Sequence, residues 1–385
     1  MSVPATQIAA VIPASGGKAV SDVQISNTHS VPTPGAGEVL IKLDFSGVCH
    51  SDVHSIRGDT PMKTDVAGHE GVGRVVAGEN SHCIALFDFG GGLDETQWMG
   101  QVVGVRWLYS SCLQCEVCEV NHTACPKQRN AGANVPGTFQ QYIVSPAIHA
   151  TKIPPGLSPD LAAPLLCAGI AMYSSIKKAK ARQGNWLAII GAGGGLGHMG
   201  IQIAAKQGLK VLAIDTGDKK KELCFSLGAT EFLDFRKVDI VEGAKSITSG
   251  LGVHAVICTA NGEAAYQQSM QMLRPLGTLV CVGIPHVSFR LPATPFEMIV
   301  KGESWKMHDL YFINRFTNEL LLNTTGLTIV GNSAGTSEEM NELLAMAVKG
   351  DVQAHIELFE LQEIVDVLQR LERSEIEGRA VLRIP

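Results

Sequence analysis

Gly191-Ala-Gly-Gly-Gly-Leu-Gly197 stands between an apolar run, Trp186–Ile190, and a helix-compatible stretch, Leu196–Gln207. Glycines at the start of a helix let an anion approach the backbone N–H groups and the positive end of the helix dipole. A strand, a glycine-rich turn and a helix in this order are typical of a phosphate-binding βαβ unit. The alternative is an ordinary tight turn. We predict that a dinucleotide pyrophosphate is bound by Gly191, Gly193, Gly194, Gly195, Leu196 and Gly197.

Asp215 follows the next apolar run, Lys210–Ile214, and lies 18 residues after Gly197. In such folds an acidic side chain about 20 residues after the glycines meets the adenosine ribose hydroxyls. Its charge repels a 2′-phosphate, so the sequence predicts NAD rather than NADP, although the lysines at 219–221 could soften the repulsion. The alternative is that Asp215 caps the following helix.

The chain around this turn alternates regularly between apolar runs and helix-compatible stretches. Repeated β-then-α order predicts right-handed crossovers and a parallel sheet covered on both faces. The fold class is therefore α/β, with a doubly wound coenzyme domain. Its expected strands are Trp186–Ile190, Lys210–Ile214, Glu231–Leu233, His254–Cys258 and Thr278–Val282, separated by helices at Leu196–Gln207, Lys219–Leu227 and Ala264–Leu273.

The sequence texture changes on either side of this domain. Residues 1–160 are rich in Gly, Pro and short alternating runs such as Glu38–Phe45 and Gln101–Trp107, which favour a mainly antiparallel, barrel-like domain. The tail returns to helical patterns and a last strand, Ala380–Ile384. We predict a catalytic domain at 1–164, the coenzyme domain at 165–334 and a return to the catalytic domain at 335–385.

Composition limits the partners and the compartment. A formal charge of −6, without a concentrated basic run, argues against nucleic acid and against an anionic membrane. No apolar stretch is read as long enough to span a membrane, and the first residues lack the pattern of a signal peptide. We expect a cytoplasmic protein.

Four of the ten cysteines lie within fourteen residues, at Cys112, Cys115, Cys118 and Cys125. C-x2-C steps let successive thiolates converge on one zinc ion in tetrahedral geometry. The alternative is two disulfides, which the scattered placement of the other cysteines in apolar stretches does not favour. Because all four ligand positions are filled, such a zinc site serves structure rather than chemistry.

A second metal constellation is spread along the chain. Cys49 opens the run Cys49-His50-Ser51-Asp52-Val53-His54, His69 lies in Gly68-His69-Glu70-Gly71, and Cys167 lies in an apolar run. Two cysteines and a histidine with one open position are the ligand type of catalytic zinc in alcohol oxidation. Each residue alone is more often a packed thiol or a satisfied histidine, but the combination with the thiolate cluster and the glycine loop indicates a catalytic zinc.

CHSDVH, AGHEGVG, the CxxCxxC cluster, LLCAGI, GAGGGLG and EGRAVL occur in the order found in the zinc-containing medium-chain alcohol dehydrogenases. The chain resembles most the yeast-type fungal members, from Thr6 to Leu382. The resemblance implies a GroES-like catalytic domain, a Rossmann coenzyme domain, two zinc ions per chain and NAD.

The resemblance also assigns roles. Zinc on Cys49, His69 and Cys167 would lower the pKa of a bound alcohol, and a hydride would pass to the nicotinamide. The proton would leave through Ser51, the nicotinamide ribose and His54. Further roles are implied for Asp52 (orienting a ligand or His54), Glu70 (modulating the zinc), His50 and Arg379 (facing the pyrophosphate), and Val282 and Ile284 (flanking the nicotinamide amide with backbone groups).

The chain departs from the family pattern at several places. The Cys118–Cys125 loop is one residue tighter, Ala171 replaces a threonine beneath the nicotinamide ring, and Thr60 stands where yeast-type enzymes have a tryptophan. The last change predicts a wider pocket and substrates larger than ethanol. Two apolar segments, 81–93 and 303–325, interrupt the pattern and are either real loops or translated introns; the second puts assembly in doubt.

The sequence thus predicts a zinc-dependent, NAD-linked oxidoreductase that acts reversibly on a primary or secondary alcohol or aldehyde and forms a homodimer or homotetramer. The alternatives are an NADP-linked cinnamyl-alcohol- or polyol-type reductase, and a catalytically silent relative that binds a nucleotide.

Overall fold

The computed structural model describes residues 3–13, 19–78, 98–285, 289 and 326–385. The chain forms two compact units, one of Met1–Ile170 with Ala334–Pro385 and the other of Ala171–Ser333. We call them the catalytic unit and the coenzyme unit. The two insertions that the sequence analysis singled out, at 81–93 and 303–325, lie outside the described residues.

The coenzyme unit is built on a six-stranded sheet in which every pair of neighbouring strands is parallel. The strand order is β12-β11-β10-β13-β14-β15, which is the doubly wound order in which the first strand lies near the centre. The expected fold class is therefore confirmed for this unit. The strands are β10 (Trp186–Ile190), β11 (Lys210–Asp215), β12 (Glu231–Asp234), β13 (Val253–Cys258), β14 (Leu273–Cys281) and β15 (Thr328–Gly331).

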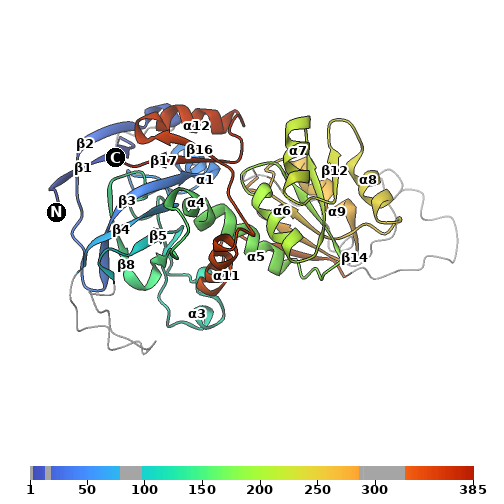
Figure 1. Ribbon diagram of the computed structural model, residues 1–385, viewed down its shortest axis with the longest axis horizontal. Coiled ribbons are helices and arrows are strands. Elements are labelled where there is room, and N and C mark those ends of the chain that lie inside the picture. Colours follow the sequence, from blue (N-terminus) through green and yellow to red (C-terminus); the bar gives the residue numbers. More distant parts are fainter. Residues whose placement is uncertain (1–2, 14–18, 79–97, 286–288, 290–325) are drawn as a thin grey trace. The chain divides into compact units, whose positions relative to one another are not determined.

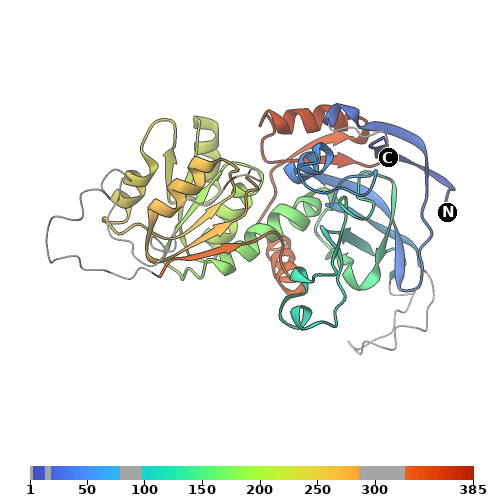
Figure 2. The ribbon, with the colours of Figure 1, turned by 180° about the vertical axis from the view of Figure 1, so that it is seen from behind.

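Helices cover both faces of this sheet: α6 packs beside α7, and α8 beside α9 (Figures 1 and 2). The strand side chains of Ala188, Ile190, Leu212 and Ile214 form a buried cluster with α8 and α9. Central strands that are apolar on both faces explain why the sequence shows continuous rather than alternating hydrophobic runs. The helices are α6 (Gly197–Lys206), α7 (Asp218–Ser226), α8 (Ile240–Ile247) and α9 (Glu263–Met272).

The catalytic unit contains a seven-stranded sheet that is antiparallel except for the pair β16 and β17. The tail strand β17 lies against β3, with Ala380 opposite Val48, and both figures show the red strand beside the blue one (Figures 1 and 2). The strands are β3 (Glu38–Val48), β4 (Gly71–Gly78), β5 (Val102–Val105), β8 (Tyr142–Pro146), β9 (Thr151–Lys152), β16 (Ile356–Glu360) and β17 (Arg379–Arg383).

Smaller elements complete this unit. Two short pairs, β1 with β2 and β6 with β7, lie outside the main sheet. The strands are β1 (Thr6–Val11), β2 (Gln24–Ser30), β6 (Leu108–Ser110) and β7 (Arg129–Asn130), and the helical segments are η1 (Val20–Asp22), α1 (His50–Arg57), α3 (Glu116–Asn121), η2 (His122–Ala124), η3 (Ala147–His149), α4 (Pro159–Pro164), η4 (Leu165–Gly169), α5 (Ile170–Lys178, which continues into the coenzyme unit), α11 (Ser337–Val348), η5 (Leu361–Glu363) and α12 (Ile364–Glu372).

One expectation about length needs correction. The continuous helix Pro159–Lys178 has 20 residues and is apolar enough, by length and composition, to cross a membrane. The sequence reading missed it because α4, η4 and α5 form one helix through the Cys167 region. Its most apolar window is 78% buried within the protein, as is typical of a core helix.

Candidate active site and metal centres

Cys49 stands at the junction between strand β3 and helix α1, where it is the N-cap residue of the helix. Asp52, three residues later, accepts a hydrogen bond from the Cys49 backbone N–H through Oδ2 at 2.8 Å. An acidic side chain at this position satisfies a free N–H of the first turn and interacts favourably with the helix dipole. The start of α1 therefore fixes the backbone that carries the Cys49 sulfur.

The imidazole of His69 is held through its Nδ1 nitrogen, on the side opposite to Nε2. Its Nδ1 lies 2.9 Å from Oδ1 of Asp52, and the Gly68 N–H donates to the same oxygen at 3.1 Å. Gly68 has φ +97°, and a Cβ there would lie 2.6 Å from Thr138 Oγ1, so only glycine fits. Because Asp52 occupies Nδ1, Nε2 is the nitrogen that faces Cys167, at 3.3 Å from its Sγ. Asp52 thus orients His69, a predicted metal ligand. His54, the other residue that Asp52 could have oriented, contacts Asp59 instead.

Cys167 lies in η4, a π-helical turn between α4 and α5. Single π turns widen a helix locally and occur often at functional sites. The Cys167 sulfur lies 3.9 Å from the sulfur of Cys49. Cys49, His69, Glu70 and Cys167 each offer a ligand atom, and these four atoms all lie within 4.8 Å of one another.

The electrostatics of this group suit a divalent cation. A hydrogen bond from Cys167 outweighs burial and lowers the pKa of Cys49 well below its usual value, with help from the charge of Arg379. Burial raises the pKa of Glu70 to about 8, although Arg379 opposes the shift. Glu70 Oε1 is bonded to Arg379, while its Oε2 is buried and has no partner among the described residues. Two thiols, an imidazole and a buried carboxyl with a free oxygen fit a zinc ion.

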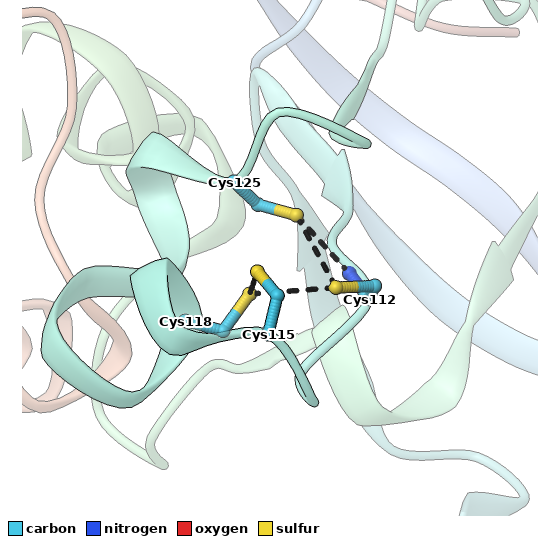
Figure 3. A group of neighbouring side chains, drawn as sticks. All are labelled: Cys112, Cys115, Cys118 and Cys125. Atoms are coloured by element: carbon cyan, nitrogen blue, oxygen red, sulfur yellow. Dashed lines mark hydrogen bonds between the residues drawn. The ribbon is translucent and has the colours of Figure 1, made fainter.

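The second cluster joins Cys112, Cys115, Cys118 and Cys125 (Figure 3). The sulfur of Cys118 lies 3.8 Å from that of Cys112 and 3.5 Å from that of Cys115, and the Cys125 and Cys112 sulfurs are 3.6 Å apart. Four thiolates around zinc at about 2.3 Å stand about 3.8 Å from one another, so the set fits a tetrahedral zinc site. The six-residue loop between Cys118 and Cys125 therefore still lets the fourth sulfur converge.

Local backbone geometry helps this cluster. Leu113 has φ +54°, a left-handed conformation that turns the chain around the Cys112 sulfur. A hydrogen bond from the Gln114 backbone, followed by the neighbouring thiols, lowers the pKa of Cys112 to about 6. The thiolate form that a metal needs is thus favoured near neutral pH.

In the coenzyme unit the glycine loop connects β10 to α6. A Cβ on Gly197 would lie 2.3 Å from the Gly191 carbonyl oxygen, so the loop can close onto the helix only with glycine there. Asp215 lies at the end of β11 and accepts the Gly193 N–H through Oδ2 at 2.9 Å. Lys220 Nζ donates to the other oxygen at 3.0 Å. The carboxylate therefore lies beside the glycine loop and is contacted by Lys220, while its predicted contact with the adenosine ribose stays a prediction.

The predicted relay residues both lie on α1. Ser51 Oγ lies 3.5 Å from the Cys49 sulfur. His54 Nδ1 lies 3.0 Å from Asp59 Oδ2, and the His54 side chain is 20% exposed. The sequence analysis missed Asp59, although its position five residues after His54 and directly after the helix-ending Gly58 is a signal that could have identified it.

The residues assigned to the coenzyme flanks have distinct positions. His50 is the first residue of α1, and burial, followed by the nearby His54, lowers its pKa. Arg379 is buried in its pair with Glu70, so its role at the pyrophosphate stays a prediction. Val282 and Ile284 follow β14 in the coenzyme unit. Ala171 is buried, and its carbonyl accepts a hydrogen bond from Asn332 Nδ2 at 2.8 Å.

Comparison with known proteins agrees with this arrangement. Residues 35–155 match the family model of the alcohol dehydrogenase GroES-like domain, and residues 195–349 match that of the zinc-binding dehydrogenases. Alcohol dehydrogenase 1 of Emericella nidulans is 36% identical over 392 residues, which span 100% of both chains.

Solved structures show the same fold. The alcohol dehydrogenase of Aeropyrum pernix is 26% identical with a TM-score of 0.78, covering 98% of this chain and 100% of that one. Acetophenone reductase of Geotrichum candidum, solved in complex with NAD, is 24% identical with a TM-score of 0.77, covering 100% and 98%; this likeness concerns the fold alone. With two cysteine-based metal clusters and full-length similarity to alcohol dehydrogenases, the chain belongs to the zinc-binding medium-chain alcohol dehydrogenase family and is a zinc-dependent alcohol dehydrogenase.

Proposed function

We propose that this enzyme transfers a hydride reversibly between NAD(H) and a primary or secondary alcohol or its aldehyde, with a preference for substrates larger than ethanol. The observation that carries the proposal is the group of buried Cys49, buried His69 and partly buried Cys167, in which Asp52 fixes the tautomer of the histidine. Zinc held there would supply a Lewis acid that lowers the pKa of an alcohol oxygen, and NAD would supply the hydride acceptor.

The transfer of the alcohol proton to solvent is assigned to residues of α1. The Ser51 hydroxyl, close to the Cys49 sulfur, is placed to accept the proton of the alcohol. His54 is partly exposed and is oriented by Asp59, so it can pass a proton to water at the other end of the relay. The nicotinamide ribose would join the two, as in the family. A dry site needs such a route because no bulk water reaches the reacting oxygen.

The coenzyme preference rests on Asp215. The Asp215 side chain is 6% exposed and lies beside the glycine loop, where its carboxylate would face the adenosine ribose. A 2′-phosphate there would meet a buried negative charge, which disfavours NADP. Lys220 neutralises part of that charge, so we expect a preference rather than an absolute choice.

The substrate size rests on Thr60. Together with Ile56, Met62 and Val135 it lines a cavity of about 690 Å³ in the catalytic unit. None of the four ligand candidates of the catalytic cluster lines this cavity, but Ser55 and Ile56 of α1 do. The cavity is therefore not the metal site itself, and the proposed wide pocket rests on the small Thr60 side chain at a position where yeast-type enzymes have a tryptophan.

The test of the reaction combines a zinc assay with the oxidation of NADH and NADPH by a panel of aldehydes. We expect zinc-dependent turnover with NADH preferred, and Asp215→Gly should narrow or reverse the ratio of kcat/KM for the two coenzymes. Asp218→Gly removes an exposed acid three residues later and is the matched control. Turnover that prefers NADPH would favour the cinnamyl-alcohol- or polyol-type reductase, and no turnover with zinc bound would favour the silent relative.

The test of the pocket compares ethanol with branched and aromatic alcohols. The larger alcohols should have the higher kcat/KM, and Thr60→Trp should reverse the order because a bulky side chain removes the space. Thr60→Val keeps the size of the side chain while removing its hydrogen bond to Ser55, so it should leave the order unchanged. A preference of the unaltered enzyme for ethanol would contradict the wide pocket and leave the dehydrogenase assignment intact.

A further inference from the structure

The segment Val282-Gly283-Ile284 leaves the sheet at the end of β14, and its backbone is bound from one side. The N–H groups of Val282 and Gly283 both donate to the Cys258 carbonyl, at 3.1 and 2.9 Å. Among the described residues nothing donates to the Val282 carbonyl or accepts from the Ile284 N–H. A carbonyl and an N–H that have no partner among the described residues, two residues apart, match the amide of a nicotinamide ring, which donates through nitrogen and accepts through oxygen.

The Gly283 carbonyl, between these two groups, has a side-chain partner. The hydroxyl of Tyr266, on α9, donates to it at 2.5 Å. Tyr266 is 2% exposed and packs against Phe289, with ring centroids 5.5 Å apart. A Cβ on Gly283 would lie 2.2 Å from the Ala260 carbonyl oxygen, so the segment passes against the end of β13 at a distance that only glycine allows.

The peptide bond links this contact to the free donor. The Gly283 carbonyl and the Ile284 N–H belong to one planar trans peptide, so they point in opposite directions. A hydroxyl that fixes the carbonyl on the inner side therefore fixes the N–H toward the outer side. Glycine alone would leave this plane free to rotate.

From this geometry we infer that Tyr266 is a positioning residue for the nicotinamide ring. Its hydroxyl holds the Gly283–Ile284 peptide plane, so that the Ile284 N–H and the Val282 carbonyl meet the carboxamide of the coenzyme in a fixed orientation. The inference rests on the proposed use of NAD. It adds a residue from α9, outside the glycine loop and the acidic ribose contact, to the coenzyme site.

Tyr266→Phe removes the hydroxyl and leaves the ring. The matched control is Ser269→Ala on the same helix, because the Ser269 hydroxyl is also buried and donates to a carbonyl, that of Ala265, at 2.6 Å, without touching Gly283. Binding of NADH and of ADP-ribose is measured for each purified protein by titration calorimetry. ADP-ribose carries the adenosine and pyrophosphate but lacks the nicotinamide, so it reports the rest of the site.

We expect Tyr266→Phe to weaken NADH binding by about 3- to 10-fold, the effect of one lost hydrogen bond, and to leave ADP-ribose unchanged. Ser269→Ala should leave the ratio of the two dissociation constants at its original value. Unchanged NADH binding in Tyr266→Phe, or an equal loss for both ligands, would overturn the positioning role.

Three further outcomes are decisive. If Tyr266→Phe does not fold, Tyr266→Met is measured instead, because it lacks the hydroxyl but fills the space with a flexible chain. It should also weaken NADH binding and leave ADP-ribose binding unchanged. If the unaltered protein binds ADP-ribose but gains nothing from the nicotinamide of NADH, the proposed function fails and this inference with it. If the unaltered protein binds NADH more tightly than ADP-ribose, but the variants keep the same ratio of the two dissociation constants, only the positioning role of Tyr266 is overturned.

Discussion

The two oxygens of Asp52 serve three groups. One accepts the Cys49 backbone N–H, and the other accepts the Gly68 N–H and faces Nδ1 of His69. Burial lowers the pKa of His69, but the charge and hydrogen bond of Asp52 outweigh it and the pKa is raised well above its usual value. A metal ion bound to Nε2 in place of a proton would be stabilised by Asp52 in the same way, because a carboxylate on the other ring nitrogen makes the imidazole a better ligand.

At the residue scale we predict that Asp52→Asn weakens the catalytic zinc. The neutral amide keeps the size of the side chain but loses the charge behind His69, so zinc affinity should fall by about 10- to 100-fold at this site. Metal analysis after dialysis should show about one zinc per chain less than in the unaltered enzyme.

His54→Gln is the comparison for this change, because His54 lies on the same helix but contacts Asp59 rather than a ligand. It should keep both metals while slowing alcohol oxidation. Full zinc content in Asp52→Asn, or zinc loss in His54→Gln, would mean that the two roles have been assigned to the wrong residues.

At the scale of elements, the sequence predicted the strands and helices that are marked by a pattern of neighbouring residues. The five expected strands of the coenzyme sheet exist because each is a short apolar run after a turn signal, and Asp215 was located because it ends one of them. Helix α8 was missed, although Asp239 caps it by accepting the N–H groups of Val241 and Glu242. Its eight residues are short for a reading that relies on periodicity.

Other features depend on contacts distant in the chain. The pairing of Glu70 with Arg379 and the hydrogen bond from Tyr266 to Gly283 each join segments that no local pattern relates. The zinc ligands could be chosen from the sequence because their residue types are rare in combination. Their supporting residues are harder to choose, because Asp59 and Tyr266 belong to residue types that occur throughout the chain and only Asp59 has a local signal, its position after Gly58.

His149, in η3, contacts the start of the four-cysteine cluster. Its Nε2 accepts the N–H of Ser111, the residue before Cys112, at 3.1 Å. Burial lowers the pKa of His149 from 6.5 to about 4. A histidine with a depressed folded-state pKa contributes stability that is present above its unfolded value and is lost as the pH falls through the folded value. The relevant window therefore runs from pH 6.5 down to about 4.

We predict that the free energy of unfolding of the zinc-saturated protein falls more steeply over this window than that of His149→Gln, by up to about 3 kcal/mol. Glutamine can accept the same N–H without titrating. Denaturant titrations at several pH values check this. Parallel curves for the two proteins would show that His149 is not the titrating group.

At the scale of the whole molecule, both candidate metal sites belong to the catalytic unit but share no residue. Metal binding at one should therefore be separable from metal binding at the other. The expected homodimer or homotetramer stays a prediction, as does the cytoplasm as its compartment.

We predict two zinc ions per purified chain, and one in Cys112→Ser. Loss of the metal ion that the four-cysteine cluster would hold should lower the melting temperature by about 5 °C or more. Cys224→Ser is the control, because Cys224 is a buried thiol of α7 outside both clusters. A single zinc in the unaltered enzyme, or two in Cys112→Ser, would contradict the separation of the sites.

The place of β17 has a consequence for how the chain is made. The coenzyme unit is one continuous segment, so it can fold while the ribosome is still adding residues. The catalytic sheet cannot close in that time, because β17, which covers the edge of β3, is formed by Arg379–Arg383, which are synthesised after the whole coenzyme unit. A nascent chain therefore carries an open strand edge until these residues have been added. Premature termination at codon 378 would leave that edge permanently available to other chains, and we expect such a product to aggregate rather than accumulate as half an enzyme.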